Sequence, residues 1–343
     1  MTTPSYGGDE ISAIVLDPGS YTTRIGYAGE DAPKANIPTF CGYYTGRHQK
    51  FKHGYYLVGD TEINTLHADM DVTNPFQDGL IIDWEANVSI WQYAFEERLR
   101  TNTSEHPLLV TEPAWNSQKN REKTLEVCFE KFNVPSFYMA KQPVLASYAI
   151  GKHTALVVDL GAQMASVAPV SEGLILKKGT IHLQILLTLG VIKQPLSGDF
   201  ISLLLKTQFS NPTPTGVYAP NPINPHYLIK QRGTSSIPDT PTNPLLRDPI
   251  QLKATDSWHA YQQERILHSM KEEFCAVLDI HSDIQCSFPL TLLTPVTHDP
   301  VKFLNCPTDQ VLLTHCYDTK RQAPFLDQIH QPSTSHHHFL FLI

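Results

Sequence analysis

Two short segments of this chain share one pattern, an apolar run that ends in aspartate, one further residue and glycine. Residues 13–20 read Ala-Ile-Val-Leu-Asp-Pro-Gly-Ser, and residues 156–163 read Leu-Val-Val-Asp-Leu-Gly-Ala-Gln. The aspartates are Asp17 and Asp159, a separation of 142 positions, and a second strand-like run follows each segment. A buried strand that turns tightly at glycine presents backbone N–H groups in a concave nest. The pattern therefore predicts a duplicated unit with one nest in each copy.

Nests of this kind bind phosphate oxygens, and an aspartate beside them can hold a hydrated Mg²⁺ ion. Two nests that face each other would hold a nucleoside triphosphate from both sides. Most isolated Asp-x-Gly sequences are ordinary hairpin turns, and this simpler interpretation stays open for each copy taken alone. The repetition favours a nucleotide site over two unrelated hairpins.

Longer motifs around the two segments resemble the actin family. Residues 17–31 resemble the first phosphate loop of actin, and residues 106–123 resemble the segment that follows its first long helix. Residues 142–151 lead into Asp159-Leu-Gly161 and resemble the helix and second phosphate loop. The resemblance implies an α/β fold of the two-lobed actin/sugar-kinase/heat-shock-70 type. Each lobe would hold one of two duplicated mixed sheets, flanked by helices, with the nucleotide cleft between the lobes.

Within that family, shorter motifs resemble the nuclear actin-related proteins of the fourth class, which are subunits of chromatin-modifying complexes. These motifs are residues 6–10 (Tyr-Gly-Gly-Asp-Glu), 195–200 (Pro-Leu-Ser-Gly-Asp-Phe) and 257–259 (Ser-Trp-His). The family resemblance as a whole covers residues 7–179, 191–205 and 255–280. It stops inside the second lobe, so we expect that lobe to be incomplete.

The resemblance also sets the expected domain boundaries. We expect a first lobe at residues 1–151, with a small loop-rich subdomain at about 41–75, and a second lobe at 152–280. The second lobe is interrupted at 180–190 and by a proline-rich insertion at 211–249. Proline at this density should prevent regular helix or sheet, so we expect an exposed or disordered insertion there. Within it, residues 225–229 could form a short ordered patch.

Residues 281–343 lack the family pattern and any clear periodicity, and we expect them to form a disordered tail. We hypothesise that this tail and residues 180–190 are mistranslated from an imperfect gene model, by a shifted reading frame and a retained intron. The alternative is a genuine divergent tail. The triplet at 336–338 (His-His-His) is either a metal site or, as we expect, part of the disordered tail.

Composition argues against several classes of protein, among them nucleic-acid-binding and membrane proteins. The net charge of −8 argues against a general nucleic-acid-binding surface, which would be basic. The six cysteines form no Cys-x-x-Cys pair or metal-binding spacing, which suits a reducing compartment. The longest apolar run, at about 183–192, is too short to span a bilayer, and residues 1–20 resemble no secretory signal. We therefore expect an intracellular protein with no membrane partner.

Local patterns predict the helices that flank the sheets. Residues 11–30 read as strand, turn and strand. Asp83 is expected to cap a helix, and Gly151 to end another that begins near Lys141. The expected core residues of the first helix are Trp84, Val88, Trp91, Phe95 and Leu99.

Two further helices are expected. Asn116 would cap one, and its apolar face would be Leu125, Cys128, Phe129 and Phe132. The other begins at Ser257 and would place Tyr261, Phe274, Val277 and Leu278 on one side. Cys128 and Cys275 both fall in these helical patterns and are expected to be buried.

The resemblance implies which residues contact the nucleotide. They are Asp17, Gly19, Ser20, Tyr21, Arg24, Gln142, Asp159, Gly161, Ala162, Gln163, Lys271 and Glu272. Asp17 would hold Mg²⁺ through a bound water, Arg24 replaces a phosphate-binding lysine, and Gln142 would orient the attacking water. Lys271 and Glu272 would contact adenine and ribose. Simpler interpretations stay open, namely a turn-capping Asp17, a surface Gln142 and a solvated Lys271-Glu272 pair.

Two replacements relative to actin are expected to weaken ATP hydrolysis more than ATP binding. Ala162 stands where actin has a second aspartate, and Ser166 stands where actin has a histidine that positions water. Phosphoryl transfer needs an oriented water and stabilised charge, whereas a nest needs only backbone N–H groups. We therefore expect ATP with Mg²⁺ to be a weak or structural ligand that is hydrolysed very slowly.

The resemblance implies a non-catalytic structural subunit of nuclear chromatin-remodelling and histone-acetyltransferase complexes. Its expected partners are actin, a long helix of the complex's scaffold subunit and, as a further option, nucleosomes or histones. One rival is a filament-forming ATPase actin, and another is a small-molecule kinase on the same fold. The basic residues at 47–53 are either an ordinary surface loop or a partner contact, because actin's polymerisation loop lies there.

Overall fold

The computed structural model describes most of the first 276 residues and a few later strands. The described residues are 12–44, 55–176, 190–210, 223–231, 244–276, 289–290, 301–305, 311–313 and 339–342. The chain forms two compact units. The first is Met1–Gln263 with His337–Ile343, and the second is Glu264–His336.

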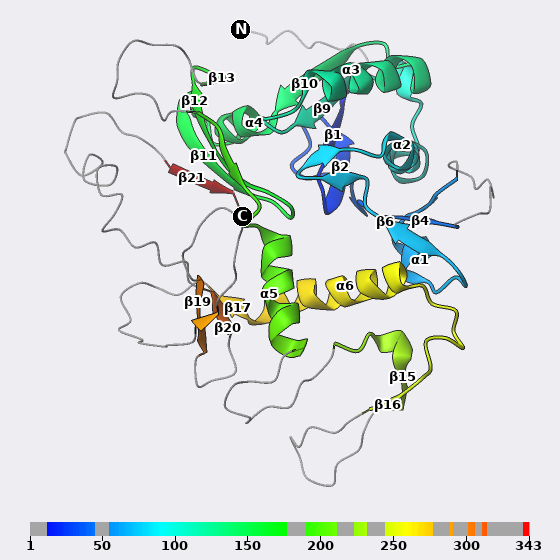
Figure 1. Cartoon of the computed structure of the whole chain (residues 1–343). Helices are drawn as coiled ribbons and strands as arrows, with labels where there is room; N and C mark the ends of the chain where they lie inside the picture. The colour runs from blue at the N-terminus through cyan, green and yellow to red at the C-terminus, as the bar shows by residue number, and fades with distance from the viewer. Residues whose placement is uncertain are drawn as a thin grey trace, which may run out of the picture. The chain divides into compact units, whose positions relative to one another are not determined.

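The first sheet has the strand order β10-β9-β1-β2-β3 (Figure 1). Its strands are β1 (Ile14–Pro18), β2 (Thr22–Tyr27), β3 (Ala35–Pro38), β9 (Leu108–Glu112) and β10 (Phe137–Lys141). β1 pairs antiparallel with β2 and parallel with β9. Ile14 and Leu16 are fully buried, while the intervening Val15 is only partly so, as the alternation of a strand requires.

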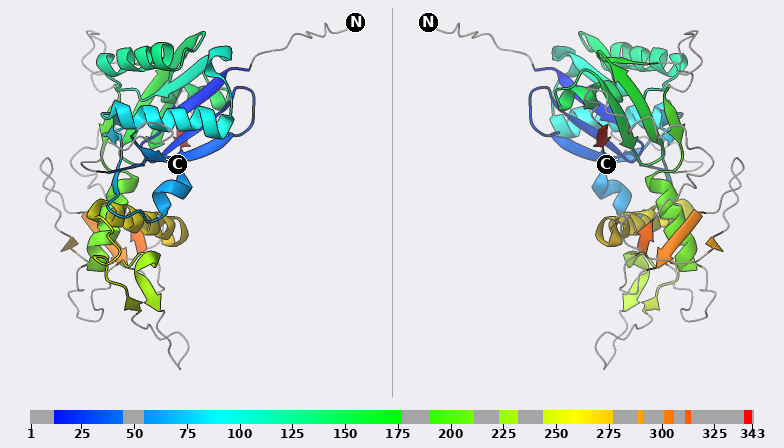
Figure 2. Two further views of the ribbon diagram at one scale, coloured as in Figure 1. Left: turned by 90° about the vertical axis from the view of Figure 1, so that its right-hand side faces the viewer. Right: turned by 90° about the vertical axis from the view of Figure 1, so that its left-hand side faces the viewer.

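Helices α2 (Trp84–Tyr93) and α3 (Gln118–Glu126) lie against this sheet (Figure 2). The chain continues from them as the π-helices η1 (Ala94–Leu99) and η3 (Val127–Lys131), and η2 (Thr103–Glu105) is a short 3₁₀ helix. Trp91 and Phe95 belong to the core, as predicted. The predicted cap of α2 is confirmed, because the Asp83 side chain accepts a hydrogen bond from the N–H of Ala86 at 3.0 Å.

Two details of α3 differ from the prediction. Ser117 caps the helix, because its Oγ accepts from the N–H of Asn120, so the prediction of Asn116 was wrong. Leu125 and Phe129 are each 42% exposed, whereas Cys128 and Phe132 are buried as expected. The π-helix explains the exposure of Phe129, since its wider turn shifts the residues that face the sheet, whereas Leu125 lies in the α-helical part before it.

The second sheet has the order β13-β12-β11-β21, with β14 paired to β12. Its strands are β11 (Ala155–Leu160), β12 (Ala165–Ser171), β13 (Leu174–Ile175), β14 (Ile192–Gln194) and β21 (Phe339–Leu342). β11 is antiparallel to β12 and parallel to β21, which repeats the arrangement of β1 with β2 and β9. The predicted duplication of mixed sheets is confirmed. α4 (Gln142–Ala149) joins the two sheets and ends before Gly151, which has φ +69°, as predicted.

A smaller layer follows β3 in the chain. It contains a three-stranded sheet of β4 (Cys41–Tyr43), β5 (Leu57–Val58) and β6 (Asp71–Thr73), helix α1 (Asp60–Asn64), and the hairpin of β7 (Phe76–Gln77) with β8 (Leu80–Ile81). Cys41 is fully buried and its Sγ lies 3.7 Å from the carbonyl oxygen of Ala86 in α2. Burial, reinforced by the charge of Asp83, raises the pKa of the Cys41 thiol. The basic residues at 47–53 lie outside the described residues.

The second half of the first unit contains α5 (Gly198–Ser210), the 3₁₀ helix η4 (His226–Leu228) and the start of α6 (Asp256–Phe274). Within the proline-rich insertion, β15 (Ile229–Gln231) pairs with β16 (Leu245–Leu246), so the prediction of no sheet there was wrong. The nearest prolines, Pro225 and Pro244, lie outside both strands and remove no ladder hydrogen bond. Residues 211–222 and 232–243 lie outside the described residues.

The second unit contains the rest of α6 and the four-stranded order β17-β20-β19-β18. These strands are β17 (Cys275–Ala276), β18 (Pro289–Leu290), β19 (Val301–Asn305) and β20 (Val311–Leu313). Cys275 is therefore in a strand and partly exposed, not buried in a helix as predicted. Residues 177–189, 277–288 and 314–338 lie outside the described residues. Strands β18 to β21 lie within 281–343, and the disorder expected for the rest of that segment stays a prediction. Across the described residues, no helix combines the length and apolar character needed to cross a membrane.

Candidate nucleotide site

Asp17, at the end of β1, accepts hydrogen bonds from two neighbouring elements and pairs with a third. Its Oδ1 accepts from the hydroxyl of Thr111 in β9 and from Gln142 Nε2 at 3.2 Å, at the start of α4. Its Oδ2 lies 3.4 Å from Nη1 of Arg24 in β2. The parallel strands β1, β9 and β10 end at one edge of the sheet, which brings these polar groups together. Three of the predicted site residues, Asp17, Arg24 and Gln142, thus meet.

Asp159 lies at the same place in the second sheet and is half-buried. Burial raises the pKa of its carboxyl, the charge of Asp17 raises it further, and Arg24 lowers it. The two aspartates of the repeat are therefore close enough to repel each other when both are charged. Carboxylate oxygens are the ligands that Mg²⁺ prefers, and a divalent cation would relieve this repulsion. The residues present fit a nucleotide-bound Mg²⁺.

Both hairpins turn at glycine in the same way. The N–H of Gly19 donates to the carbonyl of Thr22 at 3.2 Å, and the N–H of Gly161 donates to the carbonyl of Met164 at 3.0 Å. A Cβ at Gly19 would lie 2.6 Å from the Thr22 oxygen, and a Cβ at Gly161 would lie 3.1 Å from the Met164 oxygen. The first turn therefore requires glycine, whereas the second would accept a Cβ only if the Met164 carbonyl shifted by a few tenths of an ångström. Because these two N–H groups serve the turns, the phosphate contacts predicted for them stay predictions.

The carbonyl groups of both turns accept hydrogen bonds from residues outside the turns. In the first turn, Thr39 donates its hydroxyl to Gly19 O at 2.7 Å, and Asn74 donates its side-chain amide to Ser20 O at 2.7 Å. In the second turn, the carbonyl of Ala162 accepts from the Ser197 hydroxyl at 2.6 Å and from the N–H of Asp199 at 2.8 Å. The start of α5 thus fixes the second turn, whereas side chains fix the first.

Gln163 has a role that the sequence did not predict. Its Oε1 accepts from the N–H of Gly79 at 3.1 Å, and its Nε2 donates to the carbonyl of Phe76 at 3.0 Å. Both partners belong to the β7–β8 hairpin of the first half of the chain. Beside them, Trp115 donates its indole N–H to Asp78 O at 3.2 Å, and Lys193 Nζ lies 5.5 Å from the Trp115 ring centroid. The second turn is therefore linked to the first half by a side-chain amide.

The residues opposite the two aspartates differ. Asp17 pairs in register with Arg24, and Asp159 pairs in register with Ser166. Ser166 is buried, with 3% of its surface exposed. The second hairpin therefore has a small buried hydroxyl where the first has a cation.

Sequence reasoning missed several residues around Asp17. Thr111 and Glu112 directly follow the apolar run at 108–110, and polar residues at the end of a buried strand are the signal that would have identified them. Glu112 is 2% exposed and accepts from Lys141 Nζ and Asn116 Nδ2 at 2.8 and 2.9 Å. This buried ion pair anchors the end of β10 directly before Gln142.

Lys271 and Glu272 lie near the end of α6, in the second compact unit. Glu272 Oε1 is 3.2 Å from His268 Nε2, one helical turn earlier. Their predicted contact with adenine and ribose stays a prediction.

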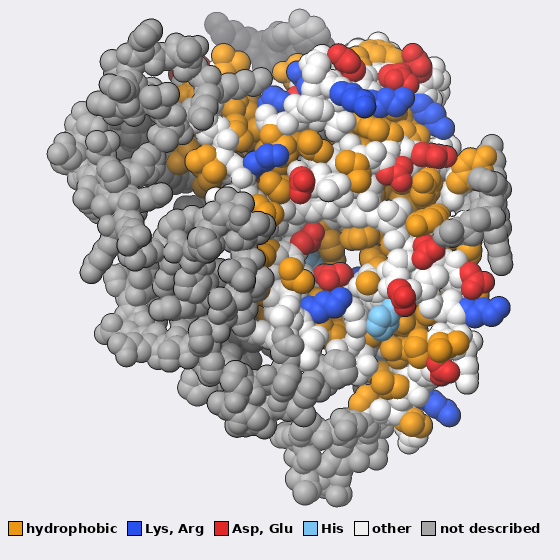
Figure 3. All heavy atoms as spheres, in the orientation of Figure 1, with side chains coloured by type: hydrophobic (Ala, Val, Ile, Leu, Met, Phe, Trp, Pro, Cys, Tyr) orange, Lys and Arg blue, Asp and Glu red, His pale blue; other side chains and the backbone are white. Residues whose placement is uncertain are grey.

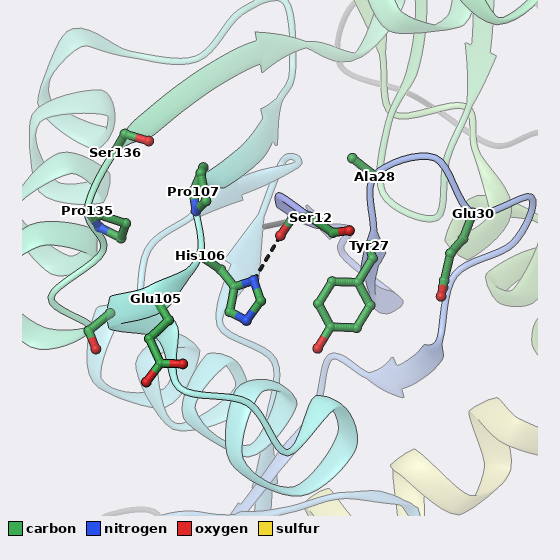
Figure 4. A pocket seen from close by; sticks show the side chains of 10 residues that line it. Ser12, Tyr27, Ala28, Glu30, Glu105, His106, Pro107, Pro135 and Ser136 are labelled. Atoms are coloured by element: carbon green, nitrogen blue, oxygen red, sulfur yellow. Dashed lines mark hydrogen bonds between the residues drawn. The ribbon is translucent and has the colours of Figure 1, made fainter. Parts of the chain in front are cut away.

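Among the cavities that the described residues line, two in the first unit bear on the site. One of about 20 Å³, lined in part by Pro18, Thr111 and Gly79, has room for one water molecule. The other, of about 830 Å³, contains none of the predicted nucleotide residues (Figure 4). Its lining is Ser12, Tyr27, Ala28, Glu30, Ser104, Glu105, His106, Pro107, Pro135 and Ser136. His106 Nδ1 lies 2.8 Å from the carbonyl oxygen of Ser12 beside it.

Charged side chains on the face shown in Figure 3 are interspersed, with acidic and basic groups side by side. This one face therefore carries charges of both signs.

Comparison with known proteins identifies the family. A sequence model of the family described as Actin matches residues 8–290, which runs past the predicted end of the resemblance at residue 280. Actin-related protein 4 of Schizosaccharomyces pombe is 38% identical over 280 residues, covering 82% of this chain and 58% of that protein.

Two further relatives are similar over a comparable share of the chain. The SWI/SNF and RSC complexes subunit arp42 of Schizosaccharomyces pombe is 34% identical over 287 residues, covering 80% of this chain and 60% of that protein. Actin-related protein 4 of Arabidopsis thaliana is 34% identical over 311 residues, covering 81% and 63%. The chain thus spans about three fifths of the length of these relatives. The resemblance found in the sequence is confirmed, and the chain belongs to the actin family.

Proposed function

We propose that this protein is a non-catalytic, actin-related subunit of nuclear chromatin-remodelling and histone-acetyltransferase complexes. The names of its relatives support this function, since one is a subunit of the SWI/SNF and RSC complexes and others are actin-related proteins of the fourth class. In such a complex it would pair with actin on a long helix of the scaffold subunit. Contact with nucleosomes or histones would follow from that position.

The non-catalytic assignment rests on the second hairpin, which keeps the backbone turn but lacks the side chains expected for hydrolysis. Its backbone turn at Gly161 matches that of the first hairpin, which supports a phosphate contact at both turns. Ala162 and Ser166 stand where the resemblance implies a carboxylate and an imidazole. Without these groups to orient water, hydrolysis should suffer far more than binding.

ATP with Mg²⁺ would then be a structural ligand. Asp17 would hold the ion through a bound water, with Asp159 beside it, and the N–H groups that follow Gly19 and Gly161 would bind the phosphates. The ion would neutralise the charge of the phosphates. A ligand that binds only the folded chain stabilises it by mass action, so ATP would hold the two lobes together without being consumed.

Affinity purification of the endogenous protein tests the proposed complex membership. We expect actin and a large remodelling or acetyltransferase scaffold to copurify with it. Recovery of cytoskeletal actin-binding proteins alone would contradict the proposal. A pelleting assay under polymerising conditions distinguishes the proposed function from the rival one, because a filament-forming ATPase actin would sediment.

Equilibrium binding and single-turnover hydrolysis of ATP test the ligand. Asp159→Ala should weaken ATP–Mg²⁺ binding by about tenfold or more, since it removes a charged ligand group worth at least about 1.4 kcal/mol. Asp31→Ala, at an exposed site, is the matched control and should leave binding unchanged. Hydrolysis at the rate of filament actin would refute the non-catalytic assignment.

A further inference from the structure

The hairpin of β15 and β16, whose strands lie side by side in Figure 1, exposes apolar side chains on both of its faces. Leu245 and Leu246 are 55% and 41% exposed, and one lies on each face because successive side chains of a strand point to opposite sides. Ile250, which follows β16, is 83% exposed. Among the described residues this sheet contains only these two strands. A two-stranded ribbon is marginally stable alone, so a third strand that covered the apolar side chains would stabilise it.

The outer edge of β16 has a backbone N–H group available for pairing. Ile229 is aligned with Leu246, and beside this pair the N–H of Arg247 donates to the carbonyl of Leu228 at 2.6 Å. In an antiparallel ladder such a pair is of the non-hydrogen-bonded kind, so its own N–H and C=O groups point to the two outer edges. On β15 the outward N–H of Ile229 already donates to the carbonyl of His226. On β16 the outward N–H of Leu246 has no partner among the described residues outside the hairpin.

The surface around this edge is basic, unlike the chain as a whole. Lys230 and Arg247 are exposed, and neither forms an ion pair with another described residue. The described part of residues 223–254 holds three basic side chains and one acidic, Asp248, whereas the whole chain has a net charge of −8. The chain as a whole would therefore repel an acidic segment, whereas this edge would attract it.

The base of the hairpin is anchored to the rest of the first unit. Leu228, directly before β15, is buried, with 6% of its surface exposed. The carbonyl of Ile223 accepts a hydrogen bond from Gln263 Nε2 in α6 at 3.0 Å. A strand edge that is already fixed in position loses little conformational entropy when a partner binds to it. The edge of β16 is thus prepared for strand pairing.

We propose that the edge of β16 is a docking site for an extended segment of a protein partner, which pairs with β16 as a third strand. The segment carries apolar side chains that cover the exposed leucines and acidic side chains that meet Lys230 and Arg247. Main-chain hydrogen bonds to Leu246 supply affinity, and the side chains supply specificity. The inference goes beyond the proposed function, because it depends neither on which complex the protein joins nor on a bound nucleotide.

The test is fluorescence anisotropy of a labelled peptide of alternating valine and glutamate, titrated with the full chain. We expect saturable binding, and we expect none when every amide of the peptide is N-methylated, because strand pairing needs the peptide N–H groups. Leu246→Pro removes the outward N–H at an edge position, where proline is tolerated, and should weaken binding by about tenfold or more. Leu246→Ala keeps that N–H and is the matched control, with an expected loss of about threefold. Equal binding of the N-methylated peptide would overturn the proposal.

A charge reversal keeps the proposal testable if Leu246→Pro fails to fold. Arg247→Glu should weaken binding of the valine–glutamate peptide by about tenfold and should allow a valine–lysine peptide to bind. Arg98→Glu, the same change at an exposed site in η1, is the matched control and should leave both affinities unchanged. Unchanged affinity of Arg247→Glu for the acidic peptide would overturn the proposal, and so would failure of the wild-type chain to bind that peptide.

Sedimentation velocity tests whether a second copy of the chain is the occupant instead. We expect the wild-type chain and Leu246→Ala to sediment alike at every concentration. Concentration-dependent dimers of the wild-type chain that Arg247→Glu abolishes would assign the edge to a second copy and overturn the proposal. Failure to recover the chromatin complexes would contradict the proposed function alone, because the peptide measurements use only the isolated chain.

Discussion

The hairpins β1–β2 and β11–β12 share a backbone and differ in chemistry. In both, the aspartate pairs in register with the residue seven positions later, Arg24 for Asp17 and Ser166 for Asp159. In both, the glycine N–H donates to the carbonyl three residues on. The match extends to a parallel neighbour on the same side of each hairpin, β9 and β21. The two hairpins therefore share their strand register, their turn hydrogen bond and the position of their parallel neighbour.

The surroundings of the two carboxylates are where the copies differ. Asp17 is paired with a cation and accepts from a hydroxyl and an amide, whereas burial and the nearby Asp17 charge raise the pKa of Asp159. The comparison teaches that a duplicated turn can keep its shape while only one copy keeps the groups that stabilise charge.

The largest effect should come from adding a Cβ to the turns. Gly19→Ala should lower the free energy of unfolding by about 3 kcal/mol and Gly161→Ala by about 1 kcal/mol. The difference follows from the closer contact at Gly19, 2.6 Å against 3.1 Å to a carbonyl oxygen that cannot easily move. Urea denaturation of the two variants measures it. Equal losses would show that the turns are not held with different tightness.

A smaller effect should follow when Asp17 is made more like Asp159. Thr111→Val removes the hydroxyl that donates to Asp17 Oδ1 and should cost about 1 kcal/mol of stability. Thr61→Val, which makes the same chemical change at an exposed site in α1, serves as the control. If the two variants unfold at the same urea concentration, the hydroxyl does not stabilise the Asp17 carboxylate.

The smallest effect should be the pH dependence of Asp159. A carboxyl whose pKa is raised above its unfolded value of 3.8 binds its proton more tightly in the folded chain, so stability falls as pH rises through the raised pKa. Asp159→Asn cannot ionise and should remove this fall, making the variant the more stable chain at neutral pH. Arg24→Met should make the fall in stability with rising pH larger, because Arg24 lowers the pKa of Asp159. Urea midpoints measured from about pH 4 to pH 7 check the sign. Parallel curves for wild type and Asp159→Asn would contradict it.

Local patterns predicted the parts of this molecule that local sequence controls. The Asp-x-Gly turns, the Asp83 cap and the end of α4 at Gly151 each depend on a few adjacent residues. The partners of Asp17 could not be predicted in this way, because Thr111 and Gln142 reach it through parallel strand pairing and connections of about a hundred residues. The outward-facing Phe129 was missed for a related reason, since a π-turn leaves no mark in a pattern read at regular helical spacing.

The buried thiols of the first half have a consequence for chemical reactivity. Thiol reagents attack the thiolate, and burial raises the pKa of Cys41 and raises that of Cys128 to about 12, so neither is reactive in the folded chain. Modification of Cys41 must then wait for β4 to separate from α2, and modification of Cys128 must wait for η3 to leave the core. The labelling rates of the two thiols would time these two openings separately, without any probe added to the protein.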